Sequence, residues 1–146
     1  MKINRRHFMH GAATLGVGLV GLKSMSMAQA ILRPLPILPM TNLIEGFDNR
    51  ISLSLSNSTH DFGTGVTSAT FGINNSYLGP VLRVKQGQTL PFEVYNTLDE
   101  MSTIHWHGLH VPGEVDGGPH QQIQPGATWS PDVPISQHAS MNWFHS

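Results

Sequence analysis

Two histidines separated by one residue are the part of this sequence best suited to chemistry. They are His105 and His107, in the segment Thr-Ile-His-Trp-His-Gly at 103–108. In an extended strand alternate side chains share a face, so both imidazoles should lie on one side and Trp106 on the other. Their Cβ atoms are then roughly 6 to 7 Å apart, which lets the two rings share one metal ion or hold two neighbouring ions.

A third histidine, His145, follows another aromatic segment, Trp143-Phe144. The chain has no cysteine, so a transition-metal site must use imidazole or carboxylate ligands, which suit zinc, copper, iron or nickel. Three histidines are also the donor set of some zinc hydrolases. The alternative interpretation is that His105 and His107 bind no metal and are inert, half-buried strand residues held by hydrogen bonds. The spacing therefore indicates a metal site but does not choose the ion.

The composition favours a single all-β domain as the frame for these residues. Of 146 residues only 12% are charged, against roughly a quarter in ordinary soluble proteins. Glycine (15) and proline (10), the residues of turns, are frequent. The formal net charge is −1 and no stripe of lysine or arginine occurs, which excludes the electrostatic footprint of a nucleic-acid partner.

Short strands with turns between them predict a β-sandwich. The hydrophobic pattern places strands at 51–55, 81–85, 89–95, 127–133 and 141–145, besides the one that carries His105. The proline-rich segment 31–40 should be an extended lead-in that drapes over the domain. Residues 57–75 are polar and glycine-rich and should form loop and hairpin, and residues 111–125 should form a long ordered loop.

The first 30 residues have the pattern of a cleaved export signal. Lys2, Arg5 and Arg6 form a basic start, residues 11–22 are apolar and uncharged, and Ala28-Gln29-Ala30 fits a small-residue cleavage site. The apolar stretch is shorter than the roughly 20 residues that span a membrane. The Arg5-Arg6 pair resembles the twin-arginine signal, which implies the twin-arginine export machinery as a partner and the periplasm as the destination.

Beyond these patterns, the sequence resembles the first domain of multicopper oxidases, and most closely the periplasmic, laccase-like copper oxidases of bacteria. The likeness covers most of residues 45–145. It is carried by the His-Trp-His-Gly segment at 105–108, Val-Pro-Gly-Glu-Val-Asp-Gly-Gly-Pro at 111–119, Gln-Pro-Gly at 124–126, Trp-Phe-His at 143–145, Leu-Gly-Pro at 78–80, Asn74, Gly87 and Tyr95-Asn96.

The resemblance implies a fold, a cofactor and roles for four residues. The fold is a cupredoxin-like Greek-key β-sandwich over residues 31–146, incomplete at its C-terminus. His105 matches a ligand of the single type 2 copper, and His107 and His145 match ligands of the paired type 3 coppers. Asp116 matches the acid that supplies protons to bound O₂; a turn residue before Gly117 is the plainer interpretation. The reaction implied couples oxidation of cuprous ion or a phenol to reduction of O₂ to water.

Two departures from the family pattern limit what this chain is expected to do alone. The second histidine strand normally reads His-x-His, yet the sequence stops at His145-Ser146. The type 1 copper needs a cysteine, and none is present. The chain is therefore expected to be an inactive N-terminal fragment of a longer oxidase. A copper-free exported scaffold protein of the same fold and a three-histidine zinc hydrolase are the alternatives. The histidines His60, His110, His120 and His138 match no ligand of the family.

Overall fold

The computed structural model describes residues 35–47 and 49–146, and the predicted signal segment 1–30 lies outside them. The chain divides into two compact units, Met1–Pro36 and Ile37–Ser146, and nearly all described residues belong to the second. The described residues form strands and loops without a helix, so the expected all-β class is confirmed. No helix in this part of the chain is long and apolar enough to cross a membrane.

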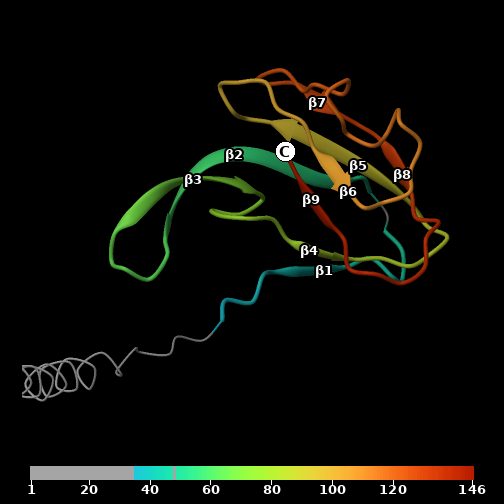
Figure 1. The fold of residues 1–146 in the computed structure, drawn as a ribbon, viewed down its shortest axis with the longest axis horizontal. Coiled ribbons are helices and arrows are strands. Elements are labelled where there is room, and N and C mark those ends of the chain that lie inside the picture. Colours follow the sequence, from blue (N-terminus) through green and yellow to red (C-terminus); the bar gives the residue numbers. More distant parts are fainter. Residues whose placement is uncertain (1–34, 48) are drawn as a thin grey trace, which may run out of the picture. The chain divides into compact units, whose positions relative to one another are not determined.

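The largest sheet has the order β3-β2-β5-β7 and is built around two strands that run parallel, β2 (Ile51–Asp61) and β5 (Thr89–Asn96). β3 (Thr67–Ile73) forms a hairpin with β2 (Figure 1). β7 (Thr128–Trp129) and β8 (Asp132–Pro134) both pair antiparallel with β5, at different points along it. In β5 buried and exposed residues alternate, as expected for a strand with one face in the core.

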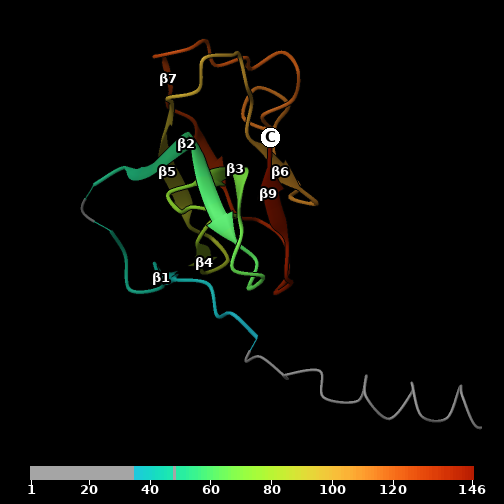
Figure 2. The same cartoon turned by 90° about the vertical axis from the view of Figure 1, so that its left-hand side faces the viewer.

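Two short strand pairs complete the domain. β1 (Met40–Asn42) runs parallel to β4 (Val81–Arg83), and β6 (His105–His107) runs antiparallel to β9 (Trp143–His145). Figure 2 shows the β6–β9 pair lying beside the larger sheet. Between them is a core of large apolar side chains, including Leu53, Phe92, Val94, Ile104, Trp106, Ile123 and Val133. This core holds β6 in place from behind.

A buried asparagine fixes the chain on its way from β5 to β6. The side chain of Asn96 is fully buried, and its Nδ2 donates to the carbonyl oxygens of Glu100 and Ile123, each at 2.8 Å. Its Oδ1 accepts from the backbone N–H of Leu98 at 3.0 Å. All of its hydrogen-bonding groups therefore have partners, as a buried amide requires.

The sequence-based strand assignments need three corrections. The strand expected at 51–55 continues to Asp61 and pairs with β3, which confirms the hairpin expected within residues 57–75. This half of the hairpin is polar because it extends past the core, and its residues are mostly exposed or half-buried. The strand expected over 127–133 is two strands, since Pro131 between them has no N–H for the ladder. The lead-in also contains a strand, β1, which pairs with β4 instead of only draping over the domain.

Candidate metal centre

A buried tryptophan sets the orientation of β6. Trp106 is only 3% exposed and stacks on Phe92 of β5, with ring centroids 4.4 Å apart. Because neighbouring side chains in a strand point to opposite faces, this anchor turns His105 and His107 outward on the same side. The predicted alternation of β6, with histidines on one face and tryptophan packed on the other, is confirmed.

The register of β6 with β9 brings the third histidine onto the same face. His105 is paired with His145, Trp106 with Phe144, and His107 with Trp143. Phe144 turns inward, where its ring lies 6.0 Å from that of Trp106 and packs against Gly79. The outer face of the two strands thus carries three imidazoles from segments 38 residues apart in the sequence.

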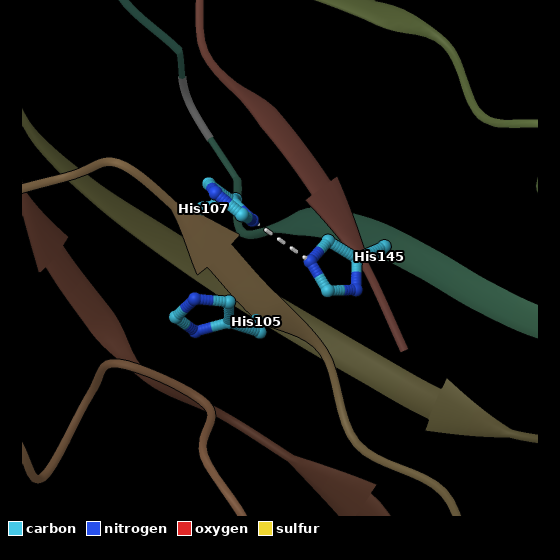
Figure 3. A group of neighbouring side chains, drawn as sticks. All are labelled: His105, His107 and His145. Carbon is cyan, nitrogen blue, oxygen red and sulfur yellow. Dashed lines mark hydrogen bonds between the residues drawn. The ribbon is translucent and has the colours of Figure 1, made fainter.

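One nitrogen atom from each of His105, His107 and His145 lies within 4.8 Å of the other two. Nδ1 of His107 lies 3.2 Å from Nε2 of His145 (Figure 3). Two imidazole nitrogens on one ion, with bonds of about 2.0–2.1 Å, lie roughly 2.9 Å apart at a right angle and about 3.4 Å apart at the tetrahedral angle. The pair therefore has the spacing of two ligands to one ion, and His105 stands beside them.

Hydrogen bonds to backbone oxygens fix one ring nitrogen of His145 and one of His105, and direct the other nitrogen of each ring outward as an acceptor. Nδ1 of His145 donates to the Ser146 carbonyl oxygen at 2.8 Å, which leaves its Nε2 lone pair available. Nδ1 of His105 donates to the Asp116 carbonyl oxygen at 3.0 Å, which leaves Nε2 of that ring available in the same way. Metal-binding histidines usually have their other ring nitrogen fixed by such a bond. The donor set therefore fits a metal that accepts imidazole.

The loop after β6 returns to lie against the strand and brings Asp116 to the site. Nε1 of Trp106 donates to the Val115 carbonyl oxygen at 2.9 Å, and the Asp116 carbonyl oxygen also accepts from the Trp106 N–H at 3.3 Å. An Asp116 carboxylate oxygen lies 3.6 Å from Nδ1 of His105, and about a third of the side chain is exposed. An acid is thus held beside the histidines, next to open solvent.

This side of the site opens into a cleft. Asp116, Gly117 and Gly118 line it together with His105 and His145, and Met101, Ser102, Thr103, Pro119, Gln122 and Ser146 form the rest of its wall. A small molecule can therefore approach the histidines from the side on which Asp116 lies.

Gly117 lets the loop approach the strand, and we expect Gly117→Ala to be strongly destabilising. Gly117 has φ +76°, and a Cβ there would overlap the carbonyl oxygen of Ile104. The left-handed conformation and the overlap together should lower the free energy of unfolding by about 2–4 kcal/mol. Denaturant unfolding measures the loss. Gly113→Ala in the same loop is the control, because nothing lies within 4 Å of a Cβ there. Equal stability of the two variants would contradict this view of the loop.

The remaining histidines of the described residues lie away from this group. His60 belongs to β2, where its Nδ1 is 3.1 Å from the Ser76 hydroxyl and its ring contacts Phe62 and Tyr77. His110, His120 and His138 are exposed. Among the described residues, His105, His107 and His145 form the single group of three or more histidine, cysteine or acidic side chains close enough to hold an ion.

Trp143 is a member of this face that the sequence analysis did not single out. Its ring centroid lies 4.7 Å from that of His107 and 4.5 Å from that of His145. The signal was available, because Trp143 stands two residues before His145 and so shares its face of the strand. Its contact with His107 depends on the register between β6 and β9, which the sequence pattern does not specify.

Comparison with known proteins identifies the family. The family model described as multicopper oxidase matches residues 54–146, and the chain belongs to this family. A solved structure described as CueO, a laccase-like multicopper oxidase from an Ochrobactrum species, is 45% identical with a TM-score of 0.70, over 77% of this chain and 25% of that one. A laccase from Pediococcus acidilactici is 30% identical, with a TM-score of 0.68 and the same coverage. These neighbours confirm the expected cupredoxin-like fold.

Two kinds of curated relative match. Cell division protein FtsP of Escherichia coli is 33% identical over 147 aligned residues, which cover 100% of this chain and 30% of that protein. Multicopper oxidase mco of Staphylococcus aureus is 42% identical over 85 residues, which cover 58% of this chain and 19% of that protein. The chain thus spans less than a third of the length of either relative. Its family uses copper and O₂.

Proposed function

We propose that this chain supplies the first, plastocyanin-like domain of a copper-dependent oxidase, over residues 31–146. The whole enzyme would couple one-electron oxidation of cuprous ion or a phenol to reduction of O₂ to water. The observation that carries the proposal is the 3.2 Å separation of His107 Nδ1 and His145 Nε2 on a strand pair that also presents His105. Family membership supports copper as the ion.

We propose that the three histidines are ligands of different copper ions in the cluster. His107 and His145 would share one of the paired type 3 coppers, because their facing nitrogens have the spacing of two ligands to one ion. His105 would bind the type 2 copper through Nε2, since its Nδ1 is engaged by the Asp116 carbonyl oxygen. For His107 to bind through Nδ1, the proton that this atom holds in the hydrogen bond to His145 must move to Nε2 or leave.

Asp116 would carry protons to the cluster. Reduction of O₂ to water consumes four electrons, which four one-electron oxidations of substrate would supply through copper, and four protons, which the protein must deliver. The Asp116 carboxylate is 3.6 Å from His105, partly exposed, and lines the cleft beside the histidines. It can therefore take a proton from solvent and release it inside the cleft, as a general acid does.

A copper-free scaffold protein of the same fold is the second candidate. It is favoured by the relatives described as cell division proteins, which align along the whole chain. The three histidines argue against it, because a scaffold has no need of three clustered imidazoles with two facing nitrogens 3.2 Å apart. A zinc hydrolase gains no support from the family match.

The coding sequence that follows codon 146 tests the oxidase proposal. The chain lacks cysteine and covers 30% or less of its relatives, so the type 1 copper ligands would have to come from later domains. We expect the reading frame to continue and to encode a cysteine flanked by histidines. A continuation to the length of the relatives without such a cysteine would favour the scaffold.

We further propose that the protein is exported to the periplasm by the twin-arginine route and cleaved after Ala30. Fused to a reporter, residues 1–35 should direct it to the periplasm, and changing both Arg5 and Arg6 to lysine should stop transport, because the receptor reads this pair. Fractionation of cells measures the result, with Lys2→Arg as the control. Equal export in a strain without the twin-arginine translocase would refute the route.

A further inference from the structure

We propose that Trp143 is a positioning residue that holds His107 and His145 in the geometry of a shared metal site. This inference rests on the proposed function of the three histidines and adds a fourth member to the site. Trp143 contributes no ligand atom, since an indole N–H only donates. It acts through its ring, which touches the imidazoles and not the ion.

The contacts of Trp143 connect the two histidines that would share an ion. Its ring plane is tilted by 30° from that of His107 and by 32° from that of His145, at centroid distances of 4.7 and 4.5 Å. Both arrangements are close to offset stacking, the favourable geometry for aromatic pairs. One rigid side chain thus fixes the planes of both rings, whose facing nitrogens are 3.2 Å apart.

His107 in particular depends on this contact. Its side chain is exposed and projects from the outer face of β6, where its ring contacts His105, His145 and Trp143. The other two are candidate ligands themselves, so Trp143 is the partner that can orient His107 before an ion arrives. Ordering a side chain in advance raises affinity, because binding no longer has to restrict its rotation.

Trp143 has no comparable role in the core. It is 60% exposed, whereas its neighbour Phe144 fills the inner face of β9 against Trp106 and Gly79. A large exposed ring stacked on two imidazoles is therefore better explained by the site than by packing of the fold. Replacing it should leave the domain folded.

Copper titration of variants of this 146-residue chain tests the inference. Trp143→Leu removes the aromatic plane and should weaken Cu²⁺ binding by about tenfold, the loss expected from two aromatic contacts. Trp143→Phe keeps a plane and should restore most of the affinity. Phe71→Leu is the matched control, because Phe71 is a 63% exposed aromatic residue on β3, and it should bind like the parent.

Fluorescence gives a second readout, which reports whether copper binds beside Trp143. A copper ion beside an indole quenches its emission, so the fraction quenched on copper addition should be smaller in Trp143→Phe than in the parent, although copper still binds. Circular dichroism and thermal unfolding of each variant show that the fold is kept.

The outcomes separate the inference from the proposed function. If the parent binds copper, His107→Ala does not, and Trp143→Leu binds as tightly as the parent, the positioning role is wrong and the histidine site stands. If the parent binds no copper, or if His107→Ala binds like the parent, both are overturned. Weak binding by Trp143→Leu together with recovery in Trp143→Phe supports the inference.

Discussion

In the complete oxidase to which we assign this chain, His107→Ala should stop oxygen consumption while the protein stays blue. The imidazole of His107 would hold one of the paired coppers together with His145, so its loss empties or distorts the place where O₂ binds. The blue colour would come from a copper–thiolate bond in a later domain, which this change does not touch. Substrate should therefore still reduce the type 1 copper, yet oxygen uptake should fall to the background rate.

Three measurements on the same sample check this result: copper content, the visible absorption of the type 1 centre, and oxygen uptake. His138→Ala is a suitable control, because His138 is an exposed histidine outside the group. A His107→Ala enzyme with normal copper loading and normal oxygen consumption would mean that β6 is only a structural strand.

Asp116→Asn should act differently, keeping the full copper content but slowing turnover by about 10²- to 10⁴-fold, the usual contribution of a positioned proton donor. The amide has nearly the same shape as the carboxylate, so the backbone bonds from Asp116 to His105 and Trp106 should survive. Only the capacity to accept and release a proton is lost.

The matched control for this change is Glu114→Gln, which removes an exposed acid from the same loop, outside the cleft. Steady-state oxygen uptake with copper analysis measures both variants. An Asp116→Asn enzyme that turns over at the parent rate would leave Asp116 as a turn residue before Gly117.

Much of the local structure of the site could be predicted from the sequence, because it depends on neighbouring residues. The strand period places His105 and His107 together and Trp106 opposite, and the burial of Trp106 against Phe92 confirms this. The cupredoxin-like fold came from the resemblance to the family. His145 was a candidate ligand from the sequence itself, and the resemblance added its expected role. The spacing of the histidines alone did not distinguish copper from zinc as the bound ion.

What the sequence could not provide depends on contacts between distant segments. The pairing of His107 with Trp143 follows from the register of two strands far apart in the sequence, which is set by packing of Trp106 and Phe144. The hydrogen bond from His105 to the Asp116 carbonyl oxygen forms because the loop passes close to the strand at Gly117. The sequence predicts too short a β2 because the outer half of this strand alternates half-buried and exposed polar residues and so has no apolar alternation.

Copper binding by the chain itself is the most direct test of the account, because its central claim is that His105, His107 and His145 form a metal site. The parent should take up copper at neutral pH and bind it less well in acid, since imidazole binds metal only when unprotonated. The variant His105→Ala/His107→Ala should show no such uptake, whereas His110→Ala/His138→Ala should titrate like the parent. A copper titration in which His105→Ala/His107→Ala matches the parent would contradict the assignment and place the binding elsewhere.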